Sequence, residues 1–186
     1  METDSASTPA SEKRDFARIG TALLFLIGII LFASTLRPDG PDVSIELIIA
    51  AVIGGYMAMN IGANDVANNV GPAVGSRALT LVGAIIIAGI FEAAGALIAG
   101  GDVVSTVKKG IINPALIDNA RVFIALMMAA LFAGALWLNL ATAFGAPVST
   151  THAIVGGVLG AGIAAGGVGI ANLSQMGMIA ASWVIS

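Results

Sequence analysis

Long uninterrupted runs of apolar residues dominate the hydrophobic pattern of this chain. The runs at residues 19–36, 79–100 and 122–143 each carry one ionisable residue or none. Each run is close to the ~20 apolar residues that cross the ~30 Å hydrocarbon core of a bilayer. Because only helices and closed barrels satisfy their backbone groups in lipid, runs of this length indicate helices. The pattern therefore predicts an all-α, polytopic membrane protein with the lipid bilayer as its surroundings.

Polar segments divide these runs into three parts. Residues 1–15 are polar and predict a disordered tail. Residues 16–37 predict an additional N-terminal transmembrane helix, because the apolar core is longer than the ~7–15 residues of a cleaved secretory signal. Residues 43–186 predict the main membrane unit, with a polar connection at 102–120. The last apolar run, from residue 173, is shorter than a full span, so we expect this unit to be incomplete at its C-terminus.

Composition and charge exclude several other classes of protein. Charged residues make up only 10% of the chain, whereas a soluble domain carries about 25%. The net charge of −3 argues against a nucleic-acid partner. The absence of cysteine excludes a disulfide scaffold and a thiolate metal site. No cofactor is expected. The basic residues divide evenly between the loops on the two sides of the membrane, so the positive-inside rule leaves the orientation open.

The first group of polar residues interrupts an apolar stretch at residues 60–69, which contain four asparagines and one aspartate. Such groups are costly in lipid, so they must face protein or a water-filled cavity, and we expect the helix to break or end at residues 62–65. Amide and carboxylate oxygens, with carbonyls freed at a helix break, suit a hard cation such as Na⁺. Alternatively, the carboxylate takes up and releases a proton, or the group only caps and joins helices. The candidate cation ligands are Asn64, Asp65 and Asn68, with Asn69 as a further possibility.

The second group lies at residues 147–152, again between apolar runs. A proline followed by a serine and two threonines predicts the start of a helix. The unpaired N–H groups of a helix start, together with the hydroxyl groups, can bind an anion, although an ordinary helix cap has the same residues. The candidate anion-binding residues are Ser149, Thr150 and Thr151, with Asp65 as an acceptor for a proton of the anion.

Three other features of the apolar runs carry weaker predictions. His152 could bond the anion, relay a proton or play a structural part only. Glu92 lies inside an apolar run, so it is either a second cation-site group or a helix-packing residue. The glycine pairs predict close helix packing; they are Gly156 with Gly160, and Gly162 with Gly166.

The two polar groups resemble the two signatures of the PiT family of inorganic phosphate transporters. The likeness lies in residues 62–68 and 147–152 and extends over about residues 45–186, with support from Phe91-Glu92, residues 110–112 and Ala141-Thr142. The resemblance implies two inverted-topology repeats that carry phosphate with Na⁺ or H⁺ by alternating access, as a symporter. It implies that Asn64, Asp65 and Asn68 hold the cation, with Asn64 and Asp65 as ligands if that cation is Na⁺. By the same likeness, phosphate is held by Ser149, Thr150 and Thr151.

One departure from the family pattern affects these expectations. The chain contains a single copy of each signature, so residues 43–186 correspond to an N-terminal repeat that is built with broken or re-entrant helices. The site would be completed by a second repeat, or by a second copy of the chain in a homo-oligomer. The implied partners are inorganic phosphate and a monovalent cation. The implied location is the plasma membrane, which is the inner membrane of a bacterium, and the protein would not be an enzyme.

Three alternatives stay open from the sequence. The nearest is a transporter of another oxyanion such as sulfate. A second is an intramembrane hydrolase that uses Ser149, His152 and Asp65, which would need a base within about 2.6–3.2 Å of the serine. The third is a membrane subunit that transports nothing.

Overall fold

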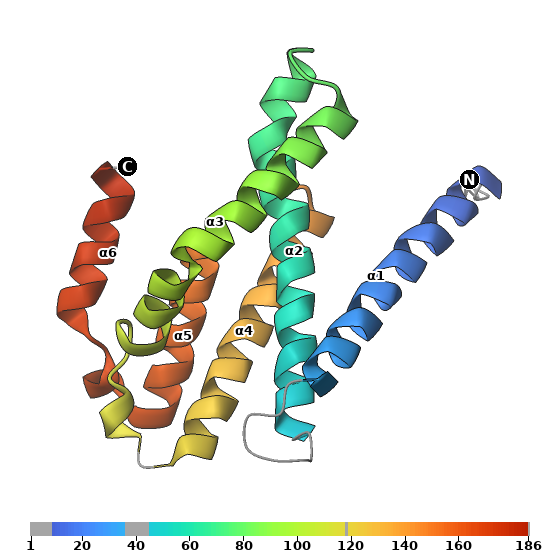
Figure 1. The fold of residues 1–186 in the computed structure, drawn as a ribbon. Coiled ribbons are helices and arrows are strands. Elements are labelled where there is room, and N and C mark those ends of the chain that lie inside the picture. The colour runs from blue at the N-terminus through green and yellow to red at the C-terminus, as the bar shows by residue number, and fades with distance from the viewer. Residues whose placement is uncertain (1–8, 36–44, 118, 186) are drawn as a thin grey trace, which may run out of the picture. The chain divides into compact units, whose positions relative to one another are not determined.

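The computed structural model describes residues 9–35, 45–117 and 119–185 of the chain (Figure 1). Over these ranges the regular elements are six α-helices and two short 3₁₀ helices. An isolated β-bridge pairs Ile112 with Ala171. Four of the helices are long and apolar enough to cross a membrane. The all-α, polytopic architecture predicted from the apolar runs is confirmed. The chain forms two compact units, Met1–Met59 and Asn60–Ser186, which are described separately.

The first unit contains α1 (Pro9–Thr35) and the beginning of α2 (Ile45–Gly75). The helix α1 starts before residue 16, so residues 9–15 of the expected polar tail are helical, and residues 1–8 lie outside the described part. The two helices approach closely at Gly55, where a Cβ atom would lie only 2.5 Å from Cδ1 of Ile29. The closeness of this contact explains a glycine at that position.

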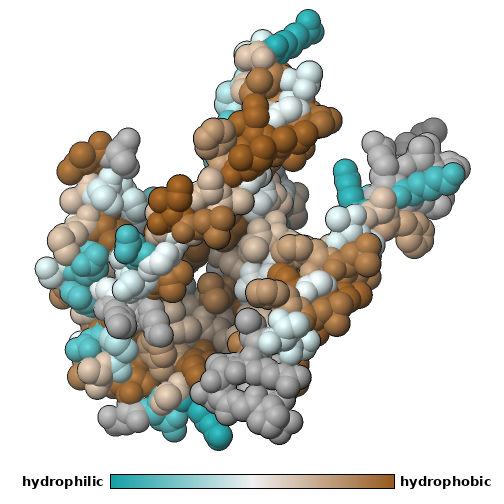
Figure 2. All heavy atoms as spheres, in the orientation of Figure 1, coloured by the Kyte–Doolittle hydropathy of each residue, from teal (hydrophilic) through white to brown (hydrophobic). Residues whose placement is uncertain are grey.

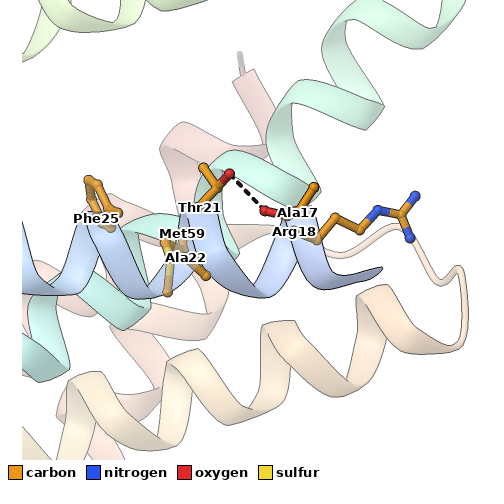
Figure 3. Close-up of a pocket in the computed structure, with 6 residues that line it drawn as sticks. All are labelled: Ala17, Arg18, Thr21, Ala22, Phe25 and Met59. Carbon is orange, nitrogen blue, oxygen red and sulfur yellow. Dashed lines mark hydrogen bonds between the residues drawn. The ribbon is translucent and has the colours of Figure 1, made fainter. Parts of the chain in front are cut away.

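An open groove of about 530 Å³ lies in the first unit (Figure 3). Most of its lining is apolar, and Thr21 satisfies its hydroxyl group by donating to the carbonyl oxygen of Ala17 at 2.9 Å. Arg18 extends away from the apolar side chains and pairs with Asp15 at 3.4 Å on the exposed surface. The groove contains none of the residues predicted for transport.

The helix α2 is continuous from Ile45 to Gly75, so the break predicted at residues 62–65 is wrong. Its 31 residues correspond to a length of about 46 Å. Residues four apart lie on the same face of a helix, which places Asn64 above Asn68, and the two side chains bond to each other. Amide groups that satisfy one another remove the main reason to break the helix.

The helix α3 (Leu81–Lys109) begins at Thr80, whose hydroxyl group accepts the backbone N–H of Gly83 at 3.2 Å. It continues through residues 102–109, which we expected to form part of a polar connection. That expectation is wrong, because those residues contain no proline and extend the last turns of the helix without difficulty. The connection is confined to residues 110–119 and contains η1 (Pro114–Leu116). Exposed apolar side chains cover much of α3 (Figure 2).

The core of the second unit lies where α4 (Ala120–Ala143), α5 (Thr150–Gly166) and α6 (Leu173–Ile185) meet (Figure 1). Buried apolar side chains of α4, α5 and the connections next to them form its centre, and side chains of α6 pack against them. The buried members are Ile111, Ile112, Leu126, Ala130, Val155, Val158 and Ile170. This packing holds the start of α5 in a defined place.

The glycines of α5 differ in what they contact. A Cβ atom on Gly157 would lie 2.8 Å from the backbone oxygen of Ala130 on α4, and one on Gly162 would lie 2.6 Å from the side chain of Ile112. A Cβ atom on Gly166 would meet the side chain of Ile170 at 2.8 Å. Gly162 and Gly166 thus pack closely, but against side chains of the connections next to α5, so the helix-to-helix packing predicted for them stays a prediction. The first pair, Gly156 with Gly160, has no neighbour within 4 Å in the described structure, so close packing there is wrong for this unit.

The connection before α4 and the connection after α5 lie side by side next to the core and are joined by two backbone hydrogen bonds. The backbone N–H of Asn113 donates to Ile170 at 2.9 Å, and that of Asn172 donates to Ile111 at 3.0 Å. Between α5 and α6 lies η2 (Val168–Ile170). With 17 residues, α5 is about 26 Å long, which is shorter than a ~30 Å hydrocarbon core.

Candidate functional site

The two polar groups of the sequence meet at one hydrogen bond. Ser149 is the N-cap of α5, so the helix begins at Thr150 as the cap residues predicted. The hydroxyl group of Thr150 donates to Oδ2 of Asp65 at 3.0 Å, across 85 residues of chain. The first turn of α5 is thereby placed beside the polar face of α2.

A separate set of hydrogen bonds joins two amide groups of α2 to the end of α4. Nδ2 of Asn68 donates to Oδ1 of Asn64 at 3.0 Å, and Nδ2 of Asn64 donates to the hydroxyl group of Thr142 at 3.4 Å. Asn64 is buried, with 4% of its surface exposed. The buried amide is thus bonded at both its oxygen and its nitrogen, as buried polar groups must be.

A cavity of about 120 Å³ opens beside these amides. It is lined by Ala63, Asn64, Ala67, Asn68, Thr142, Gly145, Ala146 and Pro147. Its polar lining combines amide and hydroxyl groups of α2 and α4 with the turn before α5, where Gly145 has a φ of 64° that favours glycine. Oxygen donors of this kind suit hard cations, whereas the described residues contain no cluster of three or more His, Cys, Asp or Glu side chains for a transition metal.

Pro72 leaves a backbone carbonyl oxygen of α2 available as a further cation ligand. It lies inside the helix without breaking it. A proline has no backbone N–H, so the carbonyl oxygen of Asn68, four residues earlier, lacks its usual helical partner. The freed carbonyl that we expected from a broken helix is therefore provided by an unbroken one.

Ser149 faces a different set of neighbours. Its Oγ accepts the backbone N–H of His152 at 3.2 Å and lies 2.6 Å from Nδ1 of the same residue. The imidazole ring of His152 stacks on the indole of Trp183, with ring centroids 3.6 Å apart and planes inclined by 26°. An open cleft of about 410 Å³ lies next to these side chains and is also lined by Trp137.

The geometry does not assemble the hydrolase that the sequence left open. Ser149 and His152 are in contact, but a catalytic triad needs a carboxylate that orients the histidine. Asp65, the carboxylate predicted for that part, bonds to Thr150 instead. The serine and histidine therefore lack the group that was expected to hold them as nucleophile and base.

Three of the predicted residues lie outside these contacts. Thr151 is exposed at the start of α5, Asn69 is exposed on α2, and Glu92 is exposed on α3. No hydrogen bond joins any of them to Asn64 or Asp65 in the part of the chain that the structure describes. Their predicted parts in binding stay predictions.

Two residues that contact the site were not predicted as site residues. Thr142 bonds to Asn64, and its place near the end of an apolar run, shortly before the second polar group, was a signal for it. Trp183 stacks on His152, and nothing in the sequence pattern distinguishes it from an ordinary membrane tryptophan.

Known proteins share much of this sequence. A model of the phosphate transporter family matches residues 61–186. A candidate phosphate permease of Helicobacter pylori is 56% identical over 179 residues, which cover 95% of this chain and 33% of the relative. One of Pyrococcus horikoshii is 46% identical over 140 residues, which cover 75% of this chain and 34% of the relative. The chain therefore spans about a third of the length of the curated relatives it matches.

One solved structure is similar in both fold and sequence. It is described as "The sodium-dependent phosphate transporter" and matches with a TM-score of 0.72 and 42% sequence identity. The match covers 76% of this chain and 35% of the solved chain.

Proposed function

This chain belongs to the phosphate transporter family, and from that premise we propose that it supplies one part of a path that carries inorganic phosphate across a membrane with Na⁺. The family is one of transporters and not of enzymes. The observation that carries the proposal is the hydrogen bond from Thr150 to Asp65, because it joins an anion-binding helix start to a cation-binding carboxylate.

The phosphate side of the site is the first turn of α5. The backbone N–H groups of a helix start point outward without intrahelical partners, and the helix dipole favours negative charge there. The hydroxyl groups of Ser149 and Thr151 add donors without a fixed positive charge, while Thr150, whose hydroxyl hydrogen goes to Asp65, contributes its backbone N–H. A site of this kind binds an oxyanion and still releases it, which transport requires.

The cation side is the polar face of α2. Asp65 supplies the negative charge, Asn64 and Asn68 supply amide oxygens, and the 120 Å³ cavity beside the two amides has room for a small ion. The solved relative is a sodium-dependent transporter, which favours Na⁺. Proton coupling through Asp65 is the alternative, and uptake driven by separate Na⁺ and proton gradients distinguishes the two.

Coupling follows from the shared position of the two sides. Without a cation, the Asp65 carboxylate lies next to the helix start and repels an anion there. A cation bound at Asn64 and Asp65 cancels this charge and adds attraction over a short distance in a partly buried place, where charges are weakly screened. Cation binding thus raises the affinity for phosphate.

Asp65 also offers a way to distinguish phosphate from sulfate. Phosphate keeps a proton near neutral pH and can donate it to a carboxylate, whereas sulfate has no proton to donate. An anion held at Thr150 would be within reach of Asp65, since the two residues are in contact.

The path needs partners beyond the described residues. In this proposal a second repeat, or a second copy of the chain, completes the site, and the two parts rock so that the loaded site opens to alternate sides of the plasma membrane. The short helix α5 supports this, because a helix that begins inside the membrane places its N-terminus at the substrate.

Uptake of radiolabelled phosphate into proteoliposomes tests the proposal. We would compare the 186-residue chain with a chimera in which the remainder of the Helicobacter pylori relative follows it. Each would be measured with a Na⁺ gradient, with a proton gradient and with neither. We expect Na⁺-driven uptake by the chimera that is lost in Asp65→Asn. Uptake driven equally well by protons alone would reject Na⁺ coupling, and sulfate uptake at the same rate would reject phosphate selectivity.

A further inference from the structure

The contact between His152 and Ser149 determines whether the hydroxyl hydrogen of Ser149 is free to bind a ligand. A serine hydroxyl group has one hydrogen to donate and two lone pairs that accept. One lone pair of Ser149 is used by the backbone N–H of His152, and Nδ1 of the ring lies 2.6 Å from the same oxygen. The tautomer of His152 therefore decides what Ser149 can offer to a ligand.

Two arrangements are possible at this contact. If Nδ1 carries no hydrogen, the hydroxyl group of Ser149 donates to it, and its only hydrogen is consumed inside the protein. If Nδ1 carries the hydrogen, Ser149 accepts twice, and its hydroxyl hydrogen is free to point outward. Only the second arrangement leaves Ser149 as a donor to an anion.

We propose that His152 is a positioning residue that donates its Nδ1–H to Ser149 and so directs the hydroxyl hydrogen of Ser149 toward phosphate. The second half of this inference rests on the proposed function. An anion that accepts from Ser149 stabilises the arrangement in which that hydrogen is free, so phosphate and the Nδ1–H tautomer favour each other by linkage.

Trp183 holds the ring in the orientation that this role requires. The stacking distance of 3.6 Å leaves the imidazole plane little freedom to rotate, so Nδ1 stays aimed at Ser149. Trp183 is half-buried on α6, and its own packing against the core fixes it in turn. The α6 helix thereby contributes to the anion site through the His152 ring.

The tautomer can be read directly, because His152 is the only histidine in the chain. We would label the protein with ¹⁵N-histidine, purify it without a histidine tag, and record long-range ¹H–¹⁵N spectra in nanodiscs at a pH where the ring is neutral. We expect a protonated Nδ1 whose signal shifts in Ser149→Ala and whose population rises when inorganic phosphate is added. A bare Nδ1 with a protonated Nε2 would overturn the proposal.

Matched variants test the effect on phosphate in the chimera with the Helicobacter pylori relative. His152→Phe keeps a ring on Trp183 but removes the donor, and His152→Asn places an amide N–H close to the position of Nδ1. We expect the half-saturating phosphate concentration to rise about tenfold in His152→Phe, the loss of one hydrogen bond to a charged ligand, with the maximal rate retained. We expect His152→Asn to have a half-saturating phosphate concentration close to that of the unsubstituted protein. Equal half-saturation in His152→Phe and the unsubstituted protein would overturn the proposal.

The two arms separate this inference from the proposed function. If the unsubstituted chimera takes up no phosphate, the proposed function fails, while the spectra still decide whether Nδ1 donates to Ser149. Trp183→Phe is the control for the ring stack, and we expect it to change the half-saturating concentration by less than about threefold because a phenyl ring still supports the imidazole.

Discussion

Thr150 donates a hydrogen bond of 3.0 Å to the Asp65 carboxylate and joins two segments that lie 85 residues apart. The donor is the first residue of α5, and the acceptor lies on a polar face of α2. A charged acceptor makes such a bond about twice as strong as one between neutral groups. The contact therefore both holds α5 against α2 and places a helix start within a few ångströms of a negative charge.

Removing the charge of Asp65 should weaken phosphate binding and flatten its dependence on Na⁺. Asp65→Asn keeps an oxygen that accepts from Thr150, so the fold should persist. At saturating Na⁺ we expect about a tenfold loss of phosphate affinity, the size of losing a charge-assisted interaction. Equilibrium binding of radiolabelled phosphate over a series of Na⁺ concentrations measures both effects. Asp102→Asn, which changes an exposed carboxylate on α3, is the control, and an unchanged Na⁺ dependence in Asp65→Asn would contradict the coupling mechanism.

Replacing Thr142 by valine should destabilise the second unit. The change keeps the shape of the side chain but removes the acceptor for Nδ2 of the buried Asn64. A buried donor without a partner costs roughly 1–3 kcal/mol, and we expect the lower end because the bond is long at 3.4 Å. Denaturant titration in micelles gives the free energy of unfolding. Thr142→Ser keeps the hydroxyl group and should lose less than half as much; equal losses in the two variants would show that the hydroxyl group is not what matters.

A methyl group on Gly157 should disturb the contact between α4 and α5. Its Cβ would lie 2.8 Å from the backbone oxygen of Ala130, and backbone cannot move aside as a side chain can. Overpacking of this kind costs about 1–3 kcal/mol. The matched control is Gly156→Ala, which meets nothing within 4 Å and should be neutral or slightly stabilising because alanine favours helix. Thermal unfolding followed by circular dichroism compares the two, and similar midpoints would argue against the close packing.

Replacing Pro72 by alanine should stabilise α2 and weaken cation binding together. Alanine restores a backbone N–H that can bond the Asn68 carbonyl, and a proline inside a helix costs about 3 kcal/mol relative to alanine. The same bond occupies an oxygen that we assign to the cation side of the site. Denaturant titration and ²²Na⁺ binding measure the two effects. Pro114→Ala, at the start of η1, is the control, and a rise in stability with unchanged Na⁺ binding would remove the Asn68 carbonyl from the site.

The predictions that held depend on neighbouring residues alone. The apolar runs predicted the membrane helices, and the run of cap residues predicted the start of α5 at Thr150. The predictions that failed depended on contacts that a single segment does not determine. The asparagines of α2 were expected to break the helix, but Asn64 and Asn68 satisfy each other one turn apart. The close-packing role was expected of Gly156 and Gly160, whereas Gly157 makes the contact with α4, because the phase of a helix against its neighbour is set by packing.

The sequence by itself determined that this chain crosses a membrane, that its apolar runs are interrupted by two polar groups, and which residue types those groups contain. These properties follow from the cost of placing polar groups in lipid, which each segment meets on its own. Only the tertiary structure decided that Thr150 reaches Asp65, that Asn64 bonds to Thr142, and that His152 stacks on Trp183. Those pairs lie far apart along the chain. The packing of α5 and α6 against the core brings His152 to Trp183, and the other two pairs join α2 to the start of α5 and the end of α4.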